Sequence, residues 1–254
     1  MTHSDKIQRF KSLHRPGDPL ILLNAWDAGS AKVLDAAGAP AIATASWACA
    51  AAHGEADGER LSLDLALANL ERIIAAVEAP VSFDLEAGYG ADPATVAASA
   101  ARAIKIGAAG LNLEDKRPGT DGLLSVDAQC ARLKAARGAG AYFLNARTDM
   151  FLERPAQDHA AALDEALRRA SAYAGAGADG IFIPGLSDPA LIARFCAASP
   201  LPVNVMAPDF EPMRALLTEA GIARISTGPG AYRALMTAFG ERAESLYRRT
   251  AQPA

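Results

Sequence analysis

Residues 103–115 read AIKIGAAGLNLED, and this stretch contains the unit that decides the fold. An alanine-rich segment with helical character ends at Gly107, a residue able to take the left-handed conformation that closes a helix, and an apolar run follows at once. The same unit recurs at 34–46, 135–149, 172–185 and 217–229, where the chain reads LDAAGAPAIATAS, AARGAGAYFLNARTD, AYAGAGADGIFIPG and LTEAGIARISTGP. This repeat predicts a fold in which helices and strands alternate.

Eight short apolar runs are the strand candidates. They are bounded by turn residues and show little alternation between polar and apolar positions, as expected of parallel strands that are buried on both faces. They lie at 20–24, 41–45, 81–85, 110–113, 142–146, 180–183, 203–206 and 224–226. The pattern predicts an α/β protein, a (β/α)8 TIM barrel that forms a single domain over residues 1–254, with an open doubly wound sheet as the alternative.

The composition excludes several classes of protein. With 254 residues, a net charge of −4, 51% hydrophobic and 21% charged residues, the chain has an ordinary globular balance and no electrostatic reason to bind nucleic acid. The three cysteines, Cys49, Cys130 and Cys196, show no disulfide or metal spacing, which favours a reducing cytoplasm. The opening MTHSDKIQRF lacks the apolar run of an export signal, and no segment predicts a membrane span.

Polar residues cluster where the predicted strands end. In a barrel of this kind the active site lies at the carboxyl ends of the strands, so polar residues there are the functional candidates. The acids are concentrated after the third and fourth strands. The candidates are Thr44, Ser46, Trp47, Asp84, Glu86, Asn112, Glu114, Asp115, Asn145, Arg147, Asp149, Asn204, Ser226 and Thr227.

Three of these acids suggest a metal site. Asp84 and Glu86 are two positions apart on a segment expected to be extended, so both can point to the same side, where Glu114 of the next strand can join them. Carboxylates that converge repel one another unless a cation sits among them, and oxygen ligands favour Mg²⁺, with Mn²⁺ as a second option. The alternative is that the acids are helix caps or ion-pair partners at the rim.

Arg147 is the basic residue expected at this end of the barrel. Its guanidinium could bind a substrate carboxylate through two parallel hydrogen bonds, or it could only neutralise the acids. The amides of Ser46 and Trp47 could complete an anion site. With Asn112 and Asn204, these residues form the predicted substrate-binding set.

Seven motifs together resemble those of the isocitrate lyase/phosphoenolpyruvate mutase superfamily. The likeness runs in order from about residue 20 to residue 232, and its relatives include oxaloacetate decarboxylases and phosphonopyruvate hydrolases. The motifs read LNAWDAGSA, TASWA, HGEADGE, DLEAGYG, GLNLED, LNARTD and ADGIFIPG.

The resemblance implies a mechanism and an assembly. Asp84 would bind Mg²⁺ directly, while Glu86, Glu114 and Asp57 would hold it through water. Asp57 and Arg147 would be the catalytic residues, acting on a small oxyacid through a metal-stabilised pyruvate enolate. The alternative for Asp57, whose assignment depends on aligning HGEADGE, is a loop acid without a catalytic role. We also expect an N-terminal helix. The family implies a C-terminal helix that can be exchanged between subunits, and hence a homo-oligomer, either a dimer or a tetramer.

Two departures from the family pattern narrow the chemistry. The lyases carry KKCGH on the loop after the fourth strand, whereas residues 114–124 read EDKRPGTDGLL, and Pro184 stands near the position of a lyase glutamate. We therefore expect a Mg²⁺-dependent lyase-type enzyme that cleaves a C–C bond beside the carbonyl of a small 2-oxo or 2-hydroxy acid, more like an oxaloacetate decarboxylase than an isocitrate lyase. The alternatives are a P–C bond enzyme, of the phosphonopyruvate hydrolase or phosphoenolpyruvate mutase type, and a noncatalytic metabolite-binding barrel.

Overall fold

The strands form one closed parallel barrel. This computed structural model describes residues 1–250, with the side chains of residues 1–248. Its strand order is β1-β9-β8-β7-β6-β5-β4-β3-β2. The strands β1 (Leu20–Leu22) and β2 (Asn24–Ala25) are two pieces of the predicted first strand, and they pair with β9 (Arg224–Ser226) and β3 (Ile42–Thr44) respectively, so the ring closes. The predicted eight-stranded barrel is confirmed, with its first strand interrupted at Leu23.

The remaining strands lie close to their predicted positions. They are β4 (Val81–Asp84), β5 (Gly110–Glu114), β6 (Phe143–Arg147), β7 (Gly180–Phe182) and β8 (Val203–Met206). Adjacent strands are parallel in every pair, so all their carboxyl ends meet at one end of the barrel.

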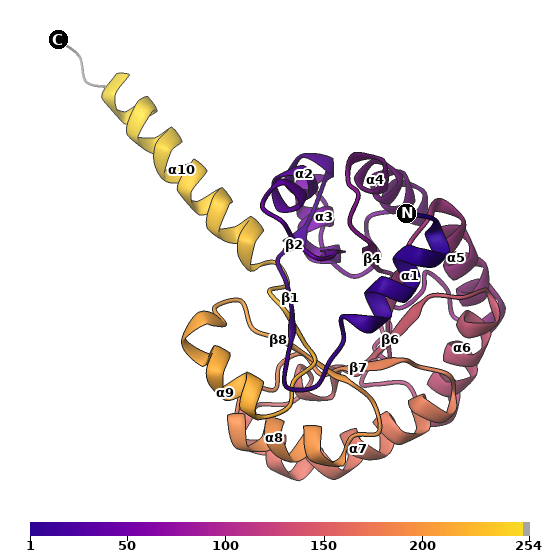
Figure 1. Cartoon of the computed structure of the whole chain (residues 1–254). Coiled ribbons are helices and arrows are strands. Elements are labelled where there is room, and N and C mark those ends of the chain that lie inside the picture. The colour runs from indigo at the N-terminus through magenta and orange to yellow at the C-terminus, as the bar shows by residue number, and fades with distance from the viewer. Residues whose placement is uncertain (251–254) are drawn as a thin grey trace.

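Helices surround the barrel as an outer ring (Figure 1). Ser62, Asp92, Ser125 and Asp188 cap the helices that they precede by accepting hydrogen bonds from first-turn amides, and Gly107 closes α5 with a φ of 117°. The helices are α1 (His3–Ser12), α2 (Ala28–Ala36), α3 (Ser46–Ala52), α4 (Leu63–Ala76), α5 (Pro93–Ile106), α6 (Val126–Gly138), α7 (His159–Gly175), α8 (Pro189–Ala198), α9 (Arg214–Glu219) and α10 (Gly230–Thr250), with short 3-10 turns η1 (Asp149–Phe151), η2 (Ala156–Asp158) and η3 (Glu211–Met213).

Helix α1 closes the amino-terminal end of the barrel, across which it lies in Figure 1. Phe10 is fully buried and meets the ring of Phe143 edge-on, at 5.6 Å between centroids, inside an apolar cluster that includes Leu20 and Leu22. Gly110 allows this approach, because a Cβ there would lie 2.6 Å from the Phe10 ring. With this end sealed, a ligand must enter from the carboxyl ends of the strands.

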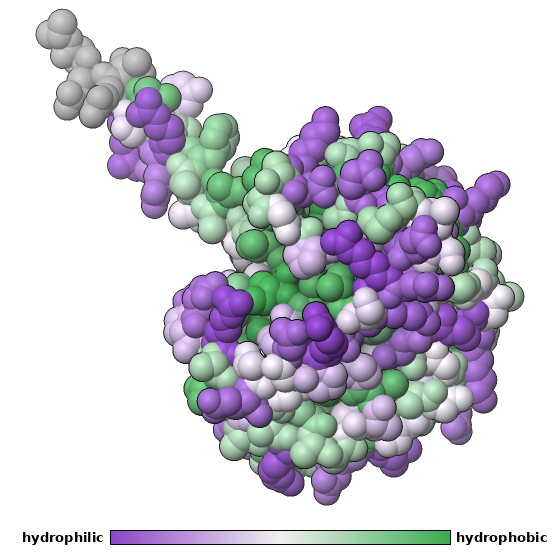
Figure 2. All heavy atoms as spheres, in the orientation of Figure 1, coloured by the Kyte–Doolittle hydropathy of each residue, from purple (hydrophilic) through white to green (hydrophobic). Residues whose placement is uncertain are grey.

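Helix α10 projects away from the barrel (Figure 1). Leu235, Met236 and Phe239 are exposed along it, and Figure 2 shows apolar residues on the part of the helix nearest to the barrel. The expected N-terminal and C-terminal helices are therefore both present, while exchange of α10 between subunits and the oligomeric state stay predictions. Within the described residues, no helix combines the length and the apolar character needed to cross a membrane.

Candidate active site

One cavity of about 240 Å³ opens at the carboxyl ends of the strands and brings together six of the nine residues to which we assigned a metal, substrate or catalytic role. Every strand from β2 to β9 contributes a residue to it, together with the start of α3, the 53–61 loop and the first turn of α10. The lining residues are Asn24, Thr44, Ala45, Ser46, Trp47, Asp57, Asp84, Asn112, Arg147, Leu152, Phe182, Pro184, Met206, Ser226, Gly228, Pro229 and Arg233. Of those nine, Glu86, Glu114 and Asn204 are not among them. Of the other strand-end candidates, Thr44 and Ser226 line the cavity, whereas Asp115, Asn145, Asp149 and Thr227 do not.

Asp84 lines this cavity and has one unsatisfied carboxylate oxygen. Its amide donates to Thr44 Oγ1 at 2.9 Å, and its Oδ2 accepts from the Ser46 amide at 3.3 Å, so the carboxylate is held in place. Its other oxygen, Oδ1, is buried and has no hydrogen-bond partner among the described residues. A buried carboxylate oxygen without a donor is unfavourable on its own and suits a bound cation.

The acids near Asp84 perturb one another. Burial raises the pKa of Asp57, and the charge of Asp84 raises it further. Burial and then Asp84 raise the pKa of Glu86 to about 7. Burial raises the pKa of Glu114 well above its usual range, an effect that Arg147 opposes and the neighbouring acids reinforce. The cluster thus favours either protons or a cation.

The donor set fits a hydrated metal ion. In the part of the chain that the structure describes, no three acidic, histidine or cysteine side chains come close enough to hold a metal by themselves. Mg²⁺ commonly keeps several waters and is bound by one or two carboxylates. Asp84, with its free oxygen, fits the direct ligand, and the surrounding acids fit partners of the bound waters.

Glu86 differs from the extended conformation that we predicted for it. It follows β4 in a turn, with a φ of 52°, and its two oxygens accept from the Glu59 amide at 2.6 Å and from the Tyr89 hydroxyl at 2.9 Å. Glu59 and Tyr89 also have positive φ, and in the described chain these are the non-glycine residues that do. Strained backbone of this kind gathers at functional sites. With both oxygens engaged, Glu86 is suited to act through water.

Arg147 is paired with acids and also lines the cavity. Its guanidinium lies 2.9 Å from Glu114 and bonds both oxygens of Asp149, at 2.5 and 2.9 Å. The neutralising role that we weighed as the alternative is therefore present in the structure. These contacts fix the plane of the guanidinium, which is compatible with substrate binding as well.

The two predicted asparagines occupy different places. Asn112 lines the cavity, and its Oδ1 accepts from Asn145 at 2.9 Å. Asn204 is buried beside the cavity and accepts from Ser226, a lining residue, at 3.3 Å. Asn204 would therefore affect a ligand through Ser226.

Two polar lining residues, Asn24 and Arg233, were missed. Asn24 ends the first strand, where it donates to the Thr44 carbonyl at 3.0 Å and accepts from the Gly228 amide at 2.9 Å. Its place at a strand end was the signal that could have found it. Arg233 comes from α10, and its guanidinium carbon lies 4.2 Å from the centroid of the Trp47 ring. No motif in the sequence marked it.

Comparisons with known proteins agree with this architecture. The sequence model of the family phosphoenolpyruvate phosphomutase matches residues 10–247. An uncharacterized protein of Mycobacterium tuberculosis is 34% identical over 93% of this chain and 88% of its own. 2-Methylisocitrate lyase of Escherichia coli and oxaloacetate decarboxylase of Rhodopseudomonas palustris are each 30% identical, over 78% and 73% of this chain and 72% and 65% of theirs.

Solved structures are similar over nearly the whole chain. A candidate phosphonomutase of Burkholderia cenocepacia is 48% identical, with a TM-score of 0.93 over 96% of this chain and 99% of its own. A phosphonopyruvate hydrolase in complex with oxalate and Mg²⁺ has the same fold, with a TM-score of 0.84 and 23% identity over 98% of this chain and 92% of its own.

Proposed function

The chain belongs to the phosphoenolpyruvate phosphomutase family, and from this premise we propose that it cleaves the carbon–carbon bond beside the carbonyl of a small 2-oxo or 2-hydroxy carboxylic acid. One observation carries the proposal. The cavity joins the free oxygen of Asp84 to the guanidinium of Arg147, so a metal-binding carboxylate and a carboxylate-binding cation line the same space. A substrate with adjacent carboxylate and carbonyl oxygens can use both.

Mg²⁺ fits the acidic side of the cavity. Asp84 would hold it directly, and Asp57, Glu86 and Glu114 would hold its waters. When bound, the ion supplies Lewis-acid stabilisation of the charge that develops on the substrate carbonyl oxygen. That three of these acids have raised pKa values supports the proposal, because a cation would relieve the repulsion that contributes to the shifts.

Arg147 and the first turn of α3 would bind and orient the substrate carboxylate. Asp149 and Glu114 hold the guanidinium of Arg147, so little side-chain freedom is lost on binding. Ser46 and Trp47 begin α3, where main-chain amides have no partner within the helix. The Ser46 amide already donates to Asp84, which leaves the Trp47 amide as the second donor to the substrate.

Asp57 would donate the proton that the reaction consumes. When the C–C bond of a 2-oxo acid breaks, its electron pair stays with the fragment that contains the carbonyl, as an enolate, and the other fragment departs, as carbon dioxide in a decarboxylation. The enolate carbon must then take up one proton. Asp57 and Asp84 are the acids among the described lining residues, and because Asp84 would hold the metal directly, Asp57 is the one left to donate this proton.

Cleavage of a P–C bond is the second candidate, favoured by the 48% identity to a candidate phosphonomutase. The site would keep the same carboxylate and metal contacts, and only the leaving group would differ. Release of phosphate from phosphonopyruvate would identify this reaction, whereas release of carbon dioxide from oxaloacetate would identify the first. Tight binding of both acids without turnover would indicate a noncatalytic binding protein.

The first test is a calorimetric titration of oxalate, which resembles the enolate of pyruvate, with and without Mg²⁺. We expect binding that requires the metal and that falls at least about tenfold in Asp84→Asn and Arg147→Lys, because each loses one charge-assisted contact or its bidentate geometry. Asp64→Asn, which changes an exposed acid on α4, is the matched control and should bind normally. Absence of oxalate binding under both conditions would contradict the proposal.

A further inference from the structure

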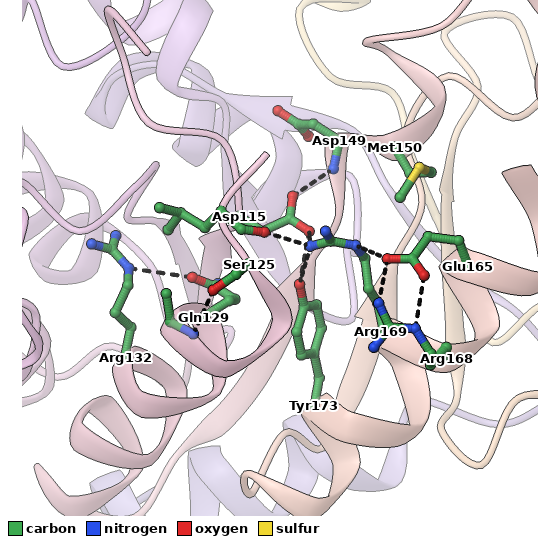
Figure 3. A network of polar contacts seen from close by, with 12 residues as sticks. Asp115, Ser125, Gln129, Arg132, Asp149, Met150, Glu165, Arg168, Arg169 and Tyr173 are labelled. Carbon is green, nitrogen blue, oxygen red and sulfur yellow. Dashed lines mark hydrogen bonds and ion pairs between the residues drawn. The ribbon is translucent and has the colours of Figure 1, made fainter. Parts of the chain in front are cut away.

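Arg132 of α6 holds the turn that follows β4, although it does not line the cavity. It is buried, with 2% of its surface exposed. Its guanidinium donates through Nη1 to the carbonyls of Gly90 at 2.8 Å and Ala91 at 3.1 Å, and through Nη2 to the carbonyl of Ala87. Its Nε donates to Gln129 Oε1 at 3.2 Å, a contact that Figure 3 shows. One buried side chain thus binds three carbonyls of a single turn, which we call the 86–91 turn.

The 86–91 turn has a backbone conformation that needs support. Glu86, Gly88 and Tyr89 have φ values of 52°, 89° and 56°, in the left-handed region, and two of them are not glycine. Non-glycine residues remain in that region only where the surrounding structure fixes them. The carbonyls that Arg132 contacts belong to the residue after Glu86 and to the two residues after Tyr89. The guanidinium therefore holds both ends of the left-handed segment.

The position of the Glu86 carboxylate depends on this turn. One of its oxygens accepts from the Tyr89 hydroxyl at 2.9 Å, and the other accepts from the Glu59 amide at 2.6 Å. The Tyr89 amide in turn donates to the carboxylate of Glu59 at 2.6 Å. Both partners of Glu86 therefore belong to the 86–91 turn or are bound to it. A shift of the turn would move the carboxylate and its partners together.

The chemistry of arginine explains why this residue type stands here. In the part of the chain that the structure describes, no carboxylate forms an ion pair with Arg132, whose donors meet carbonyl and amide oxygens instead. Burial of a charge without a counter-ion is costly, and an apolar side chain of similar size would fill the space without that cost. What arginine adds is a rigid fork of donors, which can bind several carbonyls at once.

We propose that Arg132 is a positioning residue that sets the affinity of the site for its cation, by fixing the 86–91 turn and through it the carboxylate of Glu86. This inference rests on the proposed function, because it takes Glu86 to hold waters of the bound Mg²⁺. Groups that orient the partners of a metal ion commonly change its affinity by about 10- to 100-fold.

Two simpler roles for Arg132 predict different results. If Arg132 acted through its charge alone, its removal would strengthen the binding of a cation, because the guanidinium is close enough to Glu59 and Glu114 to interact with them and would repel a second cation nearby. If Arg132 only stabilised the fold, its removal would lower stability and leave the affinity for the cation unchanged. A positioning role predicts weaker binding of the cation.

The experiment measures the Kd of Mg²⁺ by calorimetry, in metal-free protein with a fixed excess of oxalate. The test variant is Arg132→Met, which keeps an unbranched side chain and removes the donors. Arg137→Met is the matched control. Arg137 also lies on α6 and donates to two carbonyls, those of Tyr142 and Gly177, each at 2.9 Å, but these residues precede β6 and β7 at the opposite end of the barrel. Chemical denaturation of each variant measures its stability.

We expect Arg132→Met to weaken Mg²⁺ binding by at least about tenfold and Arg137→Met to leave it within about twofold, although both should lower the midpoint of denaturation. Arg132→Lys should recover part of the loss, because it keeps donors without the fork. At saturating Mg²⁺, the oxalate affinity of Arg132→Met should return close to that of the parent, because Arg147 is unaffected. If Arg132→Met does not fold, Arg132→Lys carries the same comparison with the control.

A double variant tests whether the effect of Arg132 passes through Glu86. In Glu86→Gln the carboxylate charge is already absent, so the further change Arg132→Met should weaken Mg²⁺ binding by less than about twofold. If the two residues acted independently, the double variant would show the product of the two separate losses.

Three results would each overturn the inference while the proposed function stands. They are unchanged or tighter Mg²⁺ binding in Arg132→Met, an equal loss in Arg137→Met, and full independence of the Arg132 and Glu86 variants. Failure of the parent protein to bind Mg²⁺ and oxalate at all would instead reject the proposed function, and this inference with it.

Discussion

Glu114 and Asp115 are neighbours in the chain, yet their side chains lie in two different electrostatic environments. Glu114 is the last residue of β5, and Asp115 follows it directly. Because successive side chains of a strand point to opposite faces, Glu114 turns toward the acids at the cavity and Asp115 turns toward the helices. One residue of the pair thus belongs to the candidate site and the other to the scaffold.

The surroundings of Glu114, which we call the inner environment, contain fewer positive charges than negative ones. Arg147 lies 2.9 Å from Glu114 but is shared with Asp149. Asp84 and Glu86 contribute further negative charge to the surroundings of Glu114. Several carboxylates therefore compete for one cation, which leaves this cluster able to accept another.

The surroundings of Asp115, which we call the outer environment, supply hydrogen-bond donors to both of its carboxylate oxygens. Asp115 is fully buried, and it accepts from the Asp149 amide at 3.0 Å, from Arg169 at 3.0 Å and from the Tyr173 hydroxyl at 2.8 Å. Figure 3 shows these donors converging on Asp115, with Glu165 contacting Arg169 on its other side. The network joins β5, η1 and α7 and has no unmet group at Asp115.

The difference teaches how to separate a structural acid from a functional one. A buried carboxylate whose donors are all supplied by the protein stabilises the fold, since removal of any partner leaves a buried charge uncompensated. A carboxylate cluster with too few donors is tolerable only if a ligand or protons complete it. Asp149 connects the inner and outer environments, because its amide donates to Asp115 while its carboxylate accepts from Arg147.

The largest expected effect is on the outer network. Asp115→Ala removes the shared acceptor and leaves the Arg169 charge poorly compensated, so we expect the free energy of unfolding to fall by about 3–5 kcal/mol. Chemical denaturation measures the change. Asp64→Ala, which breaks the exposed pair with Arg102, is the control and should cost less than about 1 kcal/mol. If the alanine variant does not fold, Tyr173→Phe, which removes the hydrogen bond to Asp115 and the one from Arg169, should still cost about 1–2 kcal/mol.

A loss for Asp115→Ala no larger than that for Asp64→Ala would remove the distinction between the two environments, because both acids would then behave as surface groups.

The second effect is a pH dependence carried by the inner cluster. The pKa of Glu86 is about 7 in the folded protein against an ordinary value of 4.5, so the native state binds more protons than the unfolded state between these pH values. Its contribution is therefore fully present below about pH 4.5 and is lost as the pH rises to about 7, by up to about 3 kcal/mol. Denaturation in EDTA should show a smaller decline for Glu86→Gln than for the parent.

Glu165 provides the control for this pH series. Its pKa is lowered, chiefly by the hydrogen bonds from Arg168, so it should contribute no decline between about pH 4.5 and 7. Glu165→Gln should therefore follow the parent in that range. If the free energy of unfolding declined with pH equally in the parent and in Glu86→Gln, the raised pKa of Glu86 would not contribute to the pH dependence of stability.

The smallest effect on stability is expected at Glu114. Since its raised pKa already favours the neutral carboxyl, Glu114→Gln should change the free energy of unfolding by less than about 1.5 kcal/mol, far below the change for Asp115→Ala. The Mg²⁺-dependent affinity of this variant for oxalate should nevertheless fall, because a bound cation favours the ionised carboxylate of Glu114 and glutamine cannot supply that charge. Normal oxalate binding together with a large loss of stability would reverse the assignment of the two neighbours.

Much of the fold followed from local patterns. Glycine-closed helices followed by apolar runs predicted the strands, and the structure confirms them within a few residues. The interruption at Leu23 was not visible, since residues 20–24 read as one apolar segment and only the pairing of β1 with β9 and of β2 with β3 divides it. The single domain over residues 1–254 stays a prediction, with 251–254 outside the described residues.

The candidate site was predictable where residues follow strands. Ser46, Asp84, Asn112 and Arg147 were found because parallel strands bring their carboxyl ends to one edge. Arg233 was not, since it belongs to a helix more than 180 residues after Trp47, and no local pattern expresses their contact. The assigned roles of all these residues remain proposals.

By itself, the sequence determined the alternation of helices and strands and the end of the barrel at which the acids gather. Each depends on backbone geometry over a few residues. Only the tertiary structure decided which acids obtain donors, where Glu86 turns and which cations face the cavity. These depend on strand register, on helices returning from distant parts of the chain and on burial, which sets the strength of every charge interaction.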